Sequence, residues 1–196
     1  MKNMDDQIVL TTLLTNSITP LGYKLTKDVG LDPIPESVKY DGMSFSLNDN
    51  VMVYRKANVT ENRPGAFLAI WKRPAKNAAN NKPIPLDVSD LDYLFIGVSE
   101  YDNKLNDEPV YSKRGLFIFP ASILIKKGIL SSDKKKGKTG FRVFPPWSDD
   151  RGVTGTNIFS DSGKKTQAWQ LPYFIEINCS NEINSNQIEK IIGGVK

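Results

Sequence analysis

Alternation of apolar and polar positions predicts most of the strands in this chain. Residues 42–57 predict a hairpin, because apolar residues alternate with polar ones on both sides of a polar turn at 48–50. Residues 93–98 are apolar without interruption, which is typical of a central strand buried on both faces. Further strands are expected at 65–72, 115–119, 141–144 and 173–177.

Helical spacing and helix-ending residues predict three helices. Apolar residues recur at helical spacing over residues 4–16, and Pro20 ends that helix because proline pushes the preceding Thr19 out of helical conformation. Shorter helices are expected at 121–127 and 186–192, and connecting loops at 20–41 and 75–85.

The order of these elements predicts an α/β or α+β fold, because a helix is followed by a run of strands and then by short helices. A chain of 196 residues supports one domain with a sizeable core. We therefore expect a single domain over 1–196, with a mixed central β-sheet flanked by a few helices. Its parts are an N-terminal helix at 1–20, a sheet core at 42–177 and a C-terminal helix at 184–193.

Four apolar runs carry Trp, Arg, Lys or Gln at their ends. They are residues 65–73, 114–120, 142–147 and 165–174. A strand that only fills a core does not need such ends. The pattern predicts that the four runs belong to one sheet that presents a polar, aromatic surface.

The charge distribution points to an anionic partner. Residues 1–50 have a net charge of −3, whereas residues 51–196 hold 22 Lys/Arg and 15 Asp/Glu, a net charge of +7. This surplus favours an anionic partner such as nucleic acid, with ordinary solvation charge as the alternative.

Composition also bears on location and excludes several chemistries. No apolar run reaches 18 residues, so we expect no membrane insertion. A cytoplasmic location is expected because the start of the chain lacks a signal-peptide pattern and the single Cys179, expected to be buried at a strand end, cannot form an intramolecular disulfide. The absence of histidine excludes Ser-His-Asp and Cys-His catalysis and histidine metal sites.

The segments 71–73, 117–120, 142–147 and 166–174, in this order, resemble the MepB family. The resemblance extends from about residue 36 to residue 174. It implies a restriction-endonuclease-like core of the PD-(D/E)xK type, in a family without an established biochemical activity. The sequence departs from the family pattern at Asn58, where a lysine is usual.

A nuclease of that fold needs carboxylates that hold Mg²⁺ and a lysine that orients water. The candidate catalytic residues are therefore Glu36, Asp90 and Lys72, with Mg²⁺ as the cofactor of a catalytic form. The alternative is that Asp90 and Asp92 cap or flank the strand that starts at Tyr93.

Aromatic side chains interleaved with cations suit single-stranded nucleic acid, because bases stack on the rings and phosphates pair with the cations. For each tryptophan the alternative is partial burial with a local hydrogen bond, and for the glutamines it is the anchoring of a loop. The candidate ligand-binding residues are Arg55, Trp71, Arg73, Arg142, Trp147, Lys165, Gln167, Trp169 and Gln170.

The sequence thus favours a nucleic-acid-binding protein with a nuclease-related core. Nuclease activity is left open and would be Mg²⁺-dependent. The alternatives are a non-enzymatic accessory protein that binds a small aromatic or anionic ligand, and a protein-interaction module.

Overall fold

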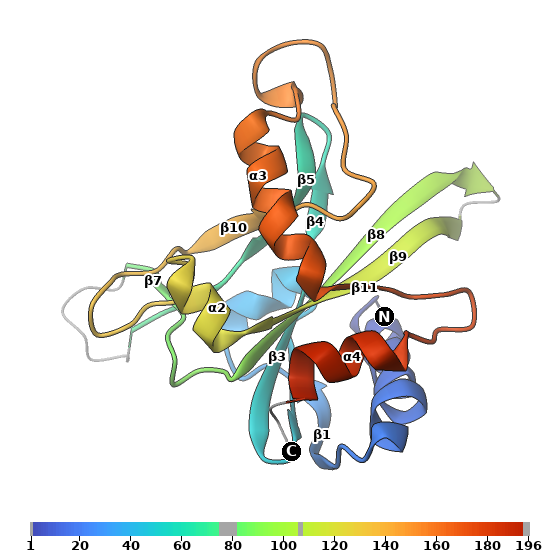
Figure 1. The fold of residues 1–196 in the computed structure, drawn as a ribbon, viewed down its shortest axis with the longest axis vertical. Coiled ribbons are helices and arrows are strands. Elements are labelled where there is room, and N and C mark those ends of the chain that lie inside the picture. The colour runs from blue at the N-terminus through green and yellow to red at the C-terminus, as the bar shows by residue number, and fades with distance from the viewer. Residues whose placement is uncertain (1, 75–81, 106–107, 194–196) are drawn as a thin grey trace.

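A six-stranded mixed sheet forms the centre of the molecule (Figure 1). The computed structural model describes the backbone of residues 2–74, 82–105 and 108–193. Strands β3 and β8 run parallel, and the other neighbouring strands of this sheet run antiparallel. In spatial order the strands are β1 (Leu25–Leu31), β2 (Met43–Leu47), β3 (Asn50–Lys56), β8 (Tyr93–Leu105), β9 (Glu108–Pro120) and β11 (Phe174–Glu176).

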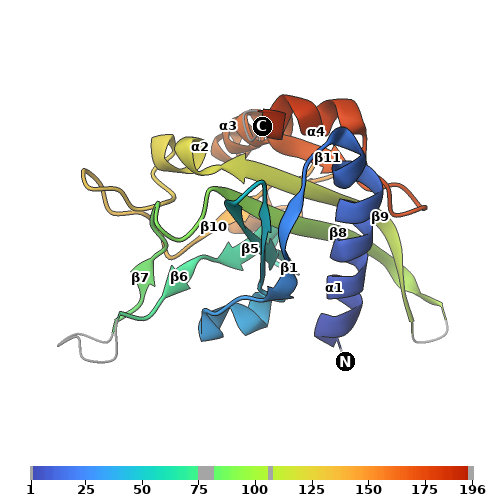
Figure 2. The same cartoon turned by 90° about the horizontal axis from the view of Figure 1, so that it is seen from below.

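Two smaller sheets flank this central sheet. One is antiparallel and contains, in order, β10 (Gly140–Val143), β5 (Arg63–Ala69) and β4 (Asn58–Thr60). The other pairs β6 (Trp71–Lys72) with β7 (Ile84–Pro85) and extends away from the body of the molecule (Figure 2).

Four α-helices accompany the sheets in the described part of the chain. They are α1 (Lys2–Leu13), α2 (Ala121–Lys126), α3 (Asp161–Gln170) and α4 (Ser185–Ile192). A π turn at Leu14–Ile18 and 3-10 turns at Thr19–Leu21, Pro35–Tyr40, Gly155–Asn157 and Leu171–Tyr173 complete the helical segments. Among the residues described, no helix combines the length and the apolar character that crossing a membrane requires.

Two apolar clusters pack against opposite faces of the central strands. Along β8, Leu94 and Ile96 belong to one cluster and Phe95, between them, belongs to the other. Successive side chains of a strand point to opposite faces, so β8 is buried on both sides at residues 94–98. Helices α1 and α4 contribute to the cluster that contains Phe95. The three-stranded sheet and α2 contribute to the cluster that contains Leu94 and Ile96, and Trp169 of α3 packs against that cluster.

The structure confirms a mixed α/β domain and most of the predicted elements. In the hairpin, Asn48 and Asp49 both have positive φ, as a tight two-residue hairpin turn requires. The helices at 121–127 and 186–192 are present with bounds shifted by one residue, and the central strand predicted at 93–98 is present but extends to Leu105. The loop expected at 75–85 lies largely outside the described residues.

Four predictions of the fold are wrong. Thr19 keeps helical dihedral angles, with φ −56° and ψ −41°, and Pro20 lies within the 3-10 turn Thr19–Leu21, so the proline does not push Thr19 out of helical conformation. Residues 20–41 are not only a loop, because they contain the edge strand β1. The four polar-ended runs do not share one sheet. Run 65–73 covers parts of β5 and β6, run 142–147 begins in β10, and run 114–120 lies in β9. Run 165–174 is mainly helix α3. Cys179 is exposed rather than buried.

The two-sided burial of β8 predicts a large cost for truncation at Phe95, which is 0% exposed and packs edge-on against Phe45 with ring centroids 5.2 Å apart. We expect Phe95→Ala to lower the free energy of unfolding by about 3–5 kcal/mol. The control Val153→Ala, at a side chain that is 90% exposed, should change it by less than about 0.5 kcal/mol. Urea denaturation measures both variants, and equal midpoints would contradict this account of the core.

Candidate functional site

Two groups of cations differ in their partners. Those of the first group are each paired with a carboxylate: Arg55, Lys56, Lys72, Arg73 and Lys113. Those of the second group, Arg63, Lys127, Lys138 and Arg142, have no carboxylate partner in the described part of the chain and line two cavities beside helix α3.

Arg55 belongs to the first group and is buried. Its guanidinium lies 2.6 Å from Oδ2 of Asp32, both side chains are at most 2% exposed, and Nη1 donates to the carbonyl of Tyr54. Burial lowers the pKa of Arg55, and the charge of Asp32 opposes that shift. The pair ties the segment after β1 to β3, and neither side chain reaches the surface. We therefore leave Arg55 out of the candidate site.

The residues predicted for catalysis are also engaged in ion pairs. Lys72 Nζ lies 2.6 Å from Oδ1 of Asp90 and 3.0 Å from Oδ2 of Asp87. Glu36 pairs with Arg73 at 3.2 Å, and the Arg73 guanidinium lies 5.5 Å from the ring centroid of Trp71. Lys72 and Asp90 do meet, as predicted, but Glu36 is held by the neighbouring arginine.

The carboxylates present do not fit a magnesium site. Asp87 Oδ1 accepts from the backbone N–H and hydroxyl of Ser89, and Asp90 Oδ2 accepts from the backbone N–H of Asp87. Their remaining oxygens face Lys72. Within the described residues no group of three or more acidic side chains is placed to hold a metal ion. Asp92, directly before β8, accepts from the backbone N–H of Val51 and so joins the start of β8 to β3.

Helix α3 positions the candidate site through two glutamines. Ser160 caps its first turn by accepting from the backbone N–H of Gly163. At the other end Gln170, which is 0% exposed, accepts from the N–H of Phe144 at 2.8 Å and donates to the carbonyl of Arg142 at 2.9 Å. Gln167 donates to the carbonyl of Pro145 at 2.9 Å. Both glutamines therefore anchor the segment after β10.

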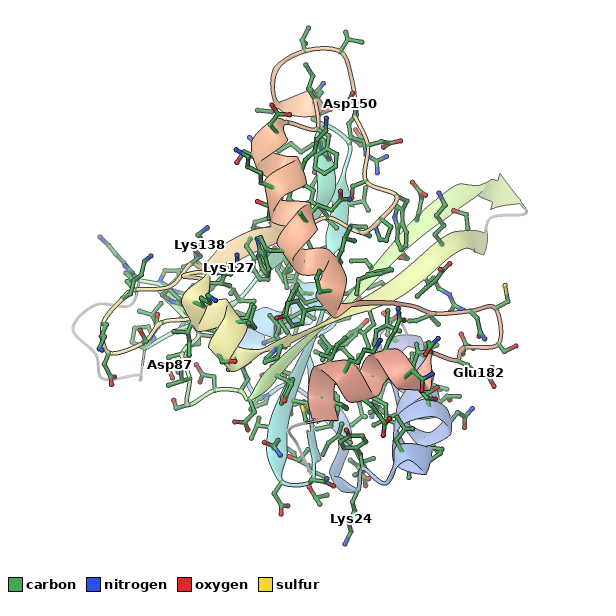
Figure 3. All side chains as sticks on the ribbon, viewed as in Figure 1. Lys24, Asp87, Lys127, Lys138, Asp150 and Glu182 are labelled. Atoms are coloured by element: carbon green, nitrogen blue, oxygen red, sulfur yellow. The ribbon has the colours of Figure 1, made fainter. Side chains whose placement is uncertain are left out.

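This anchoring opens a cavity of about 380 Å³ that we call the Trp169 cavity. Its lining includes three cations, Lys127, Lys138 and Arg142, and none of the described residues that line it is acidic. Lys127 Nζ lies 4.9 Å from the ring centroid of Trp169, and the other neighbour of that ring is Phe119. Figure 3 shows Lys127 and Lys138 close together beside α2.

Trp147 and Lys165 do not line this cavity. Trp147 packs edge-on against Phe174, with ring centroids 5.5 Å apart, and lies against the apolar cluster. Lys165 is exposed on α3. The structure thus brings together Arg142, Trp169 and Gln170 of the predicted set and leaves the other predicted residues elsewhere.

Sequence reasoning missed two of the cavity's cations. Lys138 closes the basic run 134–138, which has no aromatic neighbour in sequence. Lys127 follows α2, which ends at Lys126, more than 40 positions before Trp169. Only the packing of α3 against α2 and β10 places these residues around one cavity.

Comparison with known proteins agrees with this fold. The MepB-like family model matches residues 35–176. The chain belongs to the MepB-like family. The crystal structure of MepB is similar to this MepB-like chain with a TM-score of 0.61 and 26% sequence identity, over 88% of this chain and 97% of that one. No curated protein matches the chain.

If Gln170 is an anchor, its loss should cost stability and not ligand contacts. Gln170→Leu keeps the volume but leaves a buried N–H and a buried carbonyl without partners, each of which costs about 1–3 kcal/mol. We expect the melting temperature to fall clearly, whereas Gln187→Leu, at an exposed position of α4, should leave it unchanged. Unchanged melting combined with lost ligand binding would instead make Gln170 a contact residue.

The Lys72–Asp87–Asp90 cluster predicts a pH dependence of stability. The hydroxyl of Ser89 lowers the pKa of Asp87, partial burial opposes that shift, and Lys72 lowers the pKa further. Burial acts to lower the pKa of Lys72, but Asp90 and Asp87 outweigh it and raise the pKa overall. A depressed carboxyl pKa contributes stability that is present above the unfolded pKa, about 3.9, and is lost as pH falls through the folded value.

We therefore expect Asp87→Asn to be less stable than the parent protein at pH 6, with the difference shrinking as pH falls below about 4. Urea denaturation at several pH values measures this. Asp133→Asn, in an exposed loop, is the matched control. A difference that stays constant from pH 6 to pH 3 would contradict the assignment.

Proposed function

We propose that the protein binds single-stranded nucleic acid in the Trp169 cavity. The observation that carries the proposal is that three cations and one indole line the same cavity, with no acidic side chain among the described residues that line it. Cations kept close together without carboxylates repel one another, and an anion relieves that repulsion. Phosphates supply the charge, and a base supplies a flat partner for the ring.

At the ring of Trp169, stacking of a base is more favourable than the cation–π contact that Lys127 makes in the free protein. A cation–π contact at an accessible site is worth about 0.5–1 kcal/mol, whereas base stacking on an aromatic side chain is worth about 1–3 kcal/mol. Lys127 has a long, flexible side chain, so its ammonium can leave the ring and pair with the adjacent phosphate. Lys127 therefore contacts the Trp169 ring in the free protein and a phosphate in the bound protein.

We infer binding rather than cleavage at this site. The relation to PD-(D/E)xK nucleases rests on family resemblance, and the carboxylates nearest Lys72 are saturated by Lys72, Ser89 and backbone N–H groups. An exposed free cysteine, Cys179, suits a reducing compartment such as the cytoplasm. In this proposal the nuclease-related core is a scaffold for a binding surface.

A second candidate function has one observation in its favour. A cavity of about 380 Å³ lies within the range of about 300–1,000 Å³ that is usual for small-molecule sites. A small aromatic anion would use the same residues, Trp169 and the lysines. Competition between such a ligand and an oligonucleotide would show which one binds more tightly.

The test is fluorescence anisotropy of a labelled oligothymidylate at a series of salt concentrations. Each phosphate contact on a single strand contributes a slope of about −0.7 to the logarithm of the binding constant against the logarithm of salt. Lys127, Lys138 and Arg142 together therefore predict a slope near −2. Undetectable binding at low salt would refute the proposal.

Two tryptophan variants separate binding from stability. Trp169→Ala should weaken binding by about 5- to 150-fold, the equivalent of about 1–3 kcal/mol for one stacked base. Trp147→Ala should lower the melting temperature, because its ring packs on Phe174, and should leave binding per folded molecule unchanged. Lys190→Gln, at an exposed position on α4, controls for the loss of one charge. The reverse pattern in the tryptophans would move the site away from Trp169.

A further inference from the structure

A second cavity lies on the other side of the segment that contains Arg142. Its volume is about 360 Å³, and Arg142 and Phe144 line both cavities. The second cavity is also lined by Arg63 and by Ser160 and Gly163 at the start of α3. None of the described residues that line it is acidic. We call it the Arg63 cavity.

Arg142 is held in place with donors to spare. Its Nη1 donates to the carbonyls of Pro64 and Gly65, and its Nη2 donates to Oγ1 of Thr60. An arginine has five N–H donors, so two of them have no partner within the described part of the chain. Because three hydrogen bonds already fix the guanidinium, an anion that accepts from its two remaining N–H groups binds a preorganised cation.

Arg63 adds a second, uncompensated charge. Its side chain is exposed and has no carboxylate partner in the described part of the chain. Burial lowers the pKa of Arg142, and the charge of Arg63 lowers it further.

We propose that the Arg63 cavity binds a phosphate group, namely the backbone phosphate next to the nucleotide held in the Trp169 cavity. The proposal rests on the proposed function, because it extends the same strand across Arg142. Helix α3 runs along both cavities, and six residues separate Gly163 from Trp169, a rise of about 9 Å. That distance suits neighbouring groups of a short single strand better than two independent ligands.

The decisive measurement is the salt dependence of oligothymidylate binding by Arg63→Gln. Loss of one phosphate contact should reduce the slope by about 0.7, and affinity at low salt should fall about tenfold. Trp169→Ala removes no charge, so it should weaken binding and leave the slope unchanged. Lys190→Gln should change neither the slope nor the affinity. Melting temperatures identify any variant that fails to fold, and Arg63→Lys, which keeps the charge, should restore the slope.

The outcomes separate this inference from the proposed function. If the parent protein binds the strand and Arg63→Gln has the slope of Lys190→Gln, the Arg63 cavity binds no phosphate although the strand still binds. If the parent protein binds no oligonucleotide, both proposals fail, and inorganic phosphate then shows whether Arg63 holds a free anion.

The source of the phosphate is tested with one further probe. A 5′-phosphorylated oligothymidylate should bind no more tightly than the unphosphorylated one, because the proposed contact is an internal phosphate. A gain in affinity with the 5′-phosphate that disappears in Arg63→Gln would assign the cavity to a strand terminus and overturn the backbone assignment.

Discussion

The buried amide of Gln170 joins helix α3 to the end of strand β10, and the arrangement of both cavities depends on this contact. One side-chain group accepts from the N–H of Phe144 and donates to the carbonyl of Arg142. These two residues line both cavities. The amide therefore fixes the backbone that carries Arg142. Because Trp169 directly precedes Gln170 in helix α3, the same contact sets the position of Trp169. A hydrophobic residue at position 170 would fill the space but would leave both backbone groups unpaired.

The distribution of ion pairs separates structural cations from cations available to a ligand. Arg55, Lys72 and Arg73 each meet a carboxylate, which stabilises the links between strands and the segments around them. Around α3 the same kinds of side chain lack carboxylates in the described part of the chain. Like charges held together cost stability unless an anion is bound, and a fold retains such an arrangement most readily where it is used. The contrast within one molecule is more informative than the net charge of +4.

Sequence patterns predicted the parts of the fold that strong local signals specify. The hairpin has residues that tolerate positive φ at its turn, β8 has an uninterrupted apolar run, and α4 has Asn184 as its N-cap. Strand β1 was missed because its register with β2 shifts twice, which breaks the alternation. Helix α3 was missed because its sequence, DSGKKTQAWQ, has few apolar residues at helical spacing. Trp169, Arg142 and Gln170 were predicted from their chemistry, but Lys127, Lys138 and Arg63 come from separate segments that only tertiary packing brings together.

The same limit explains the candidate catalytic residues. A sequence shows that Asp90 and Lys72 are present, but it does not show that the lysine will be shared by two aspartates whose other oxygens accept from Ser89 and from the backbone. A metal-binding carboxylate needs lone pairs directed at open space, and these lone pairs are directed at donors. The cluster of one lysine and two aspartates has a formal charge of −1, so it does not attract a phosphate, and its carboxylate oxygens already accept from protein donors. The cavities beside α3 combine uncompensated cations, an aromatic ring and a fixed backbone, and that combination is why we place the function there rather than at Lys72.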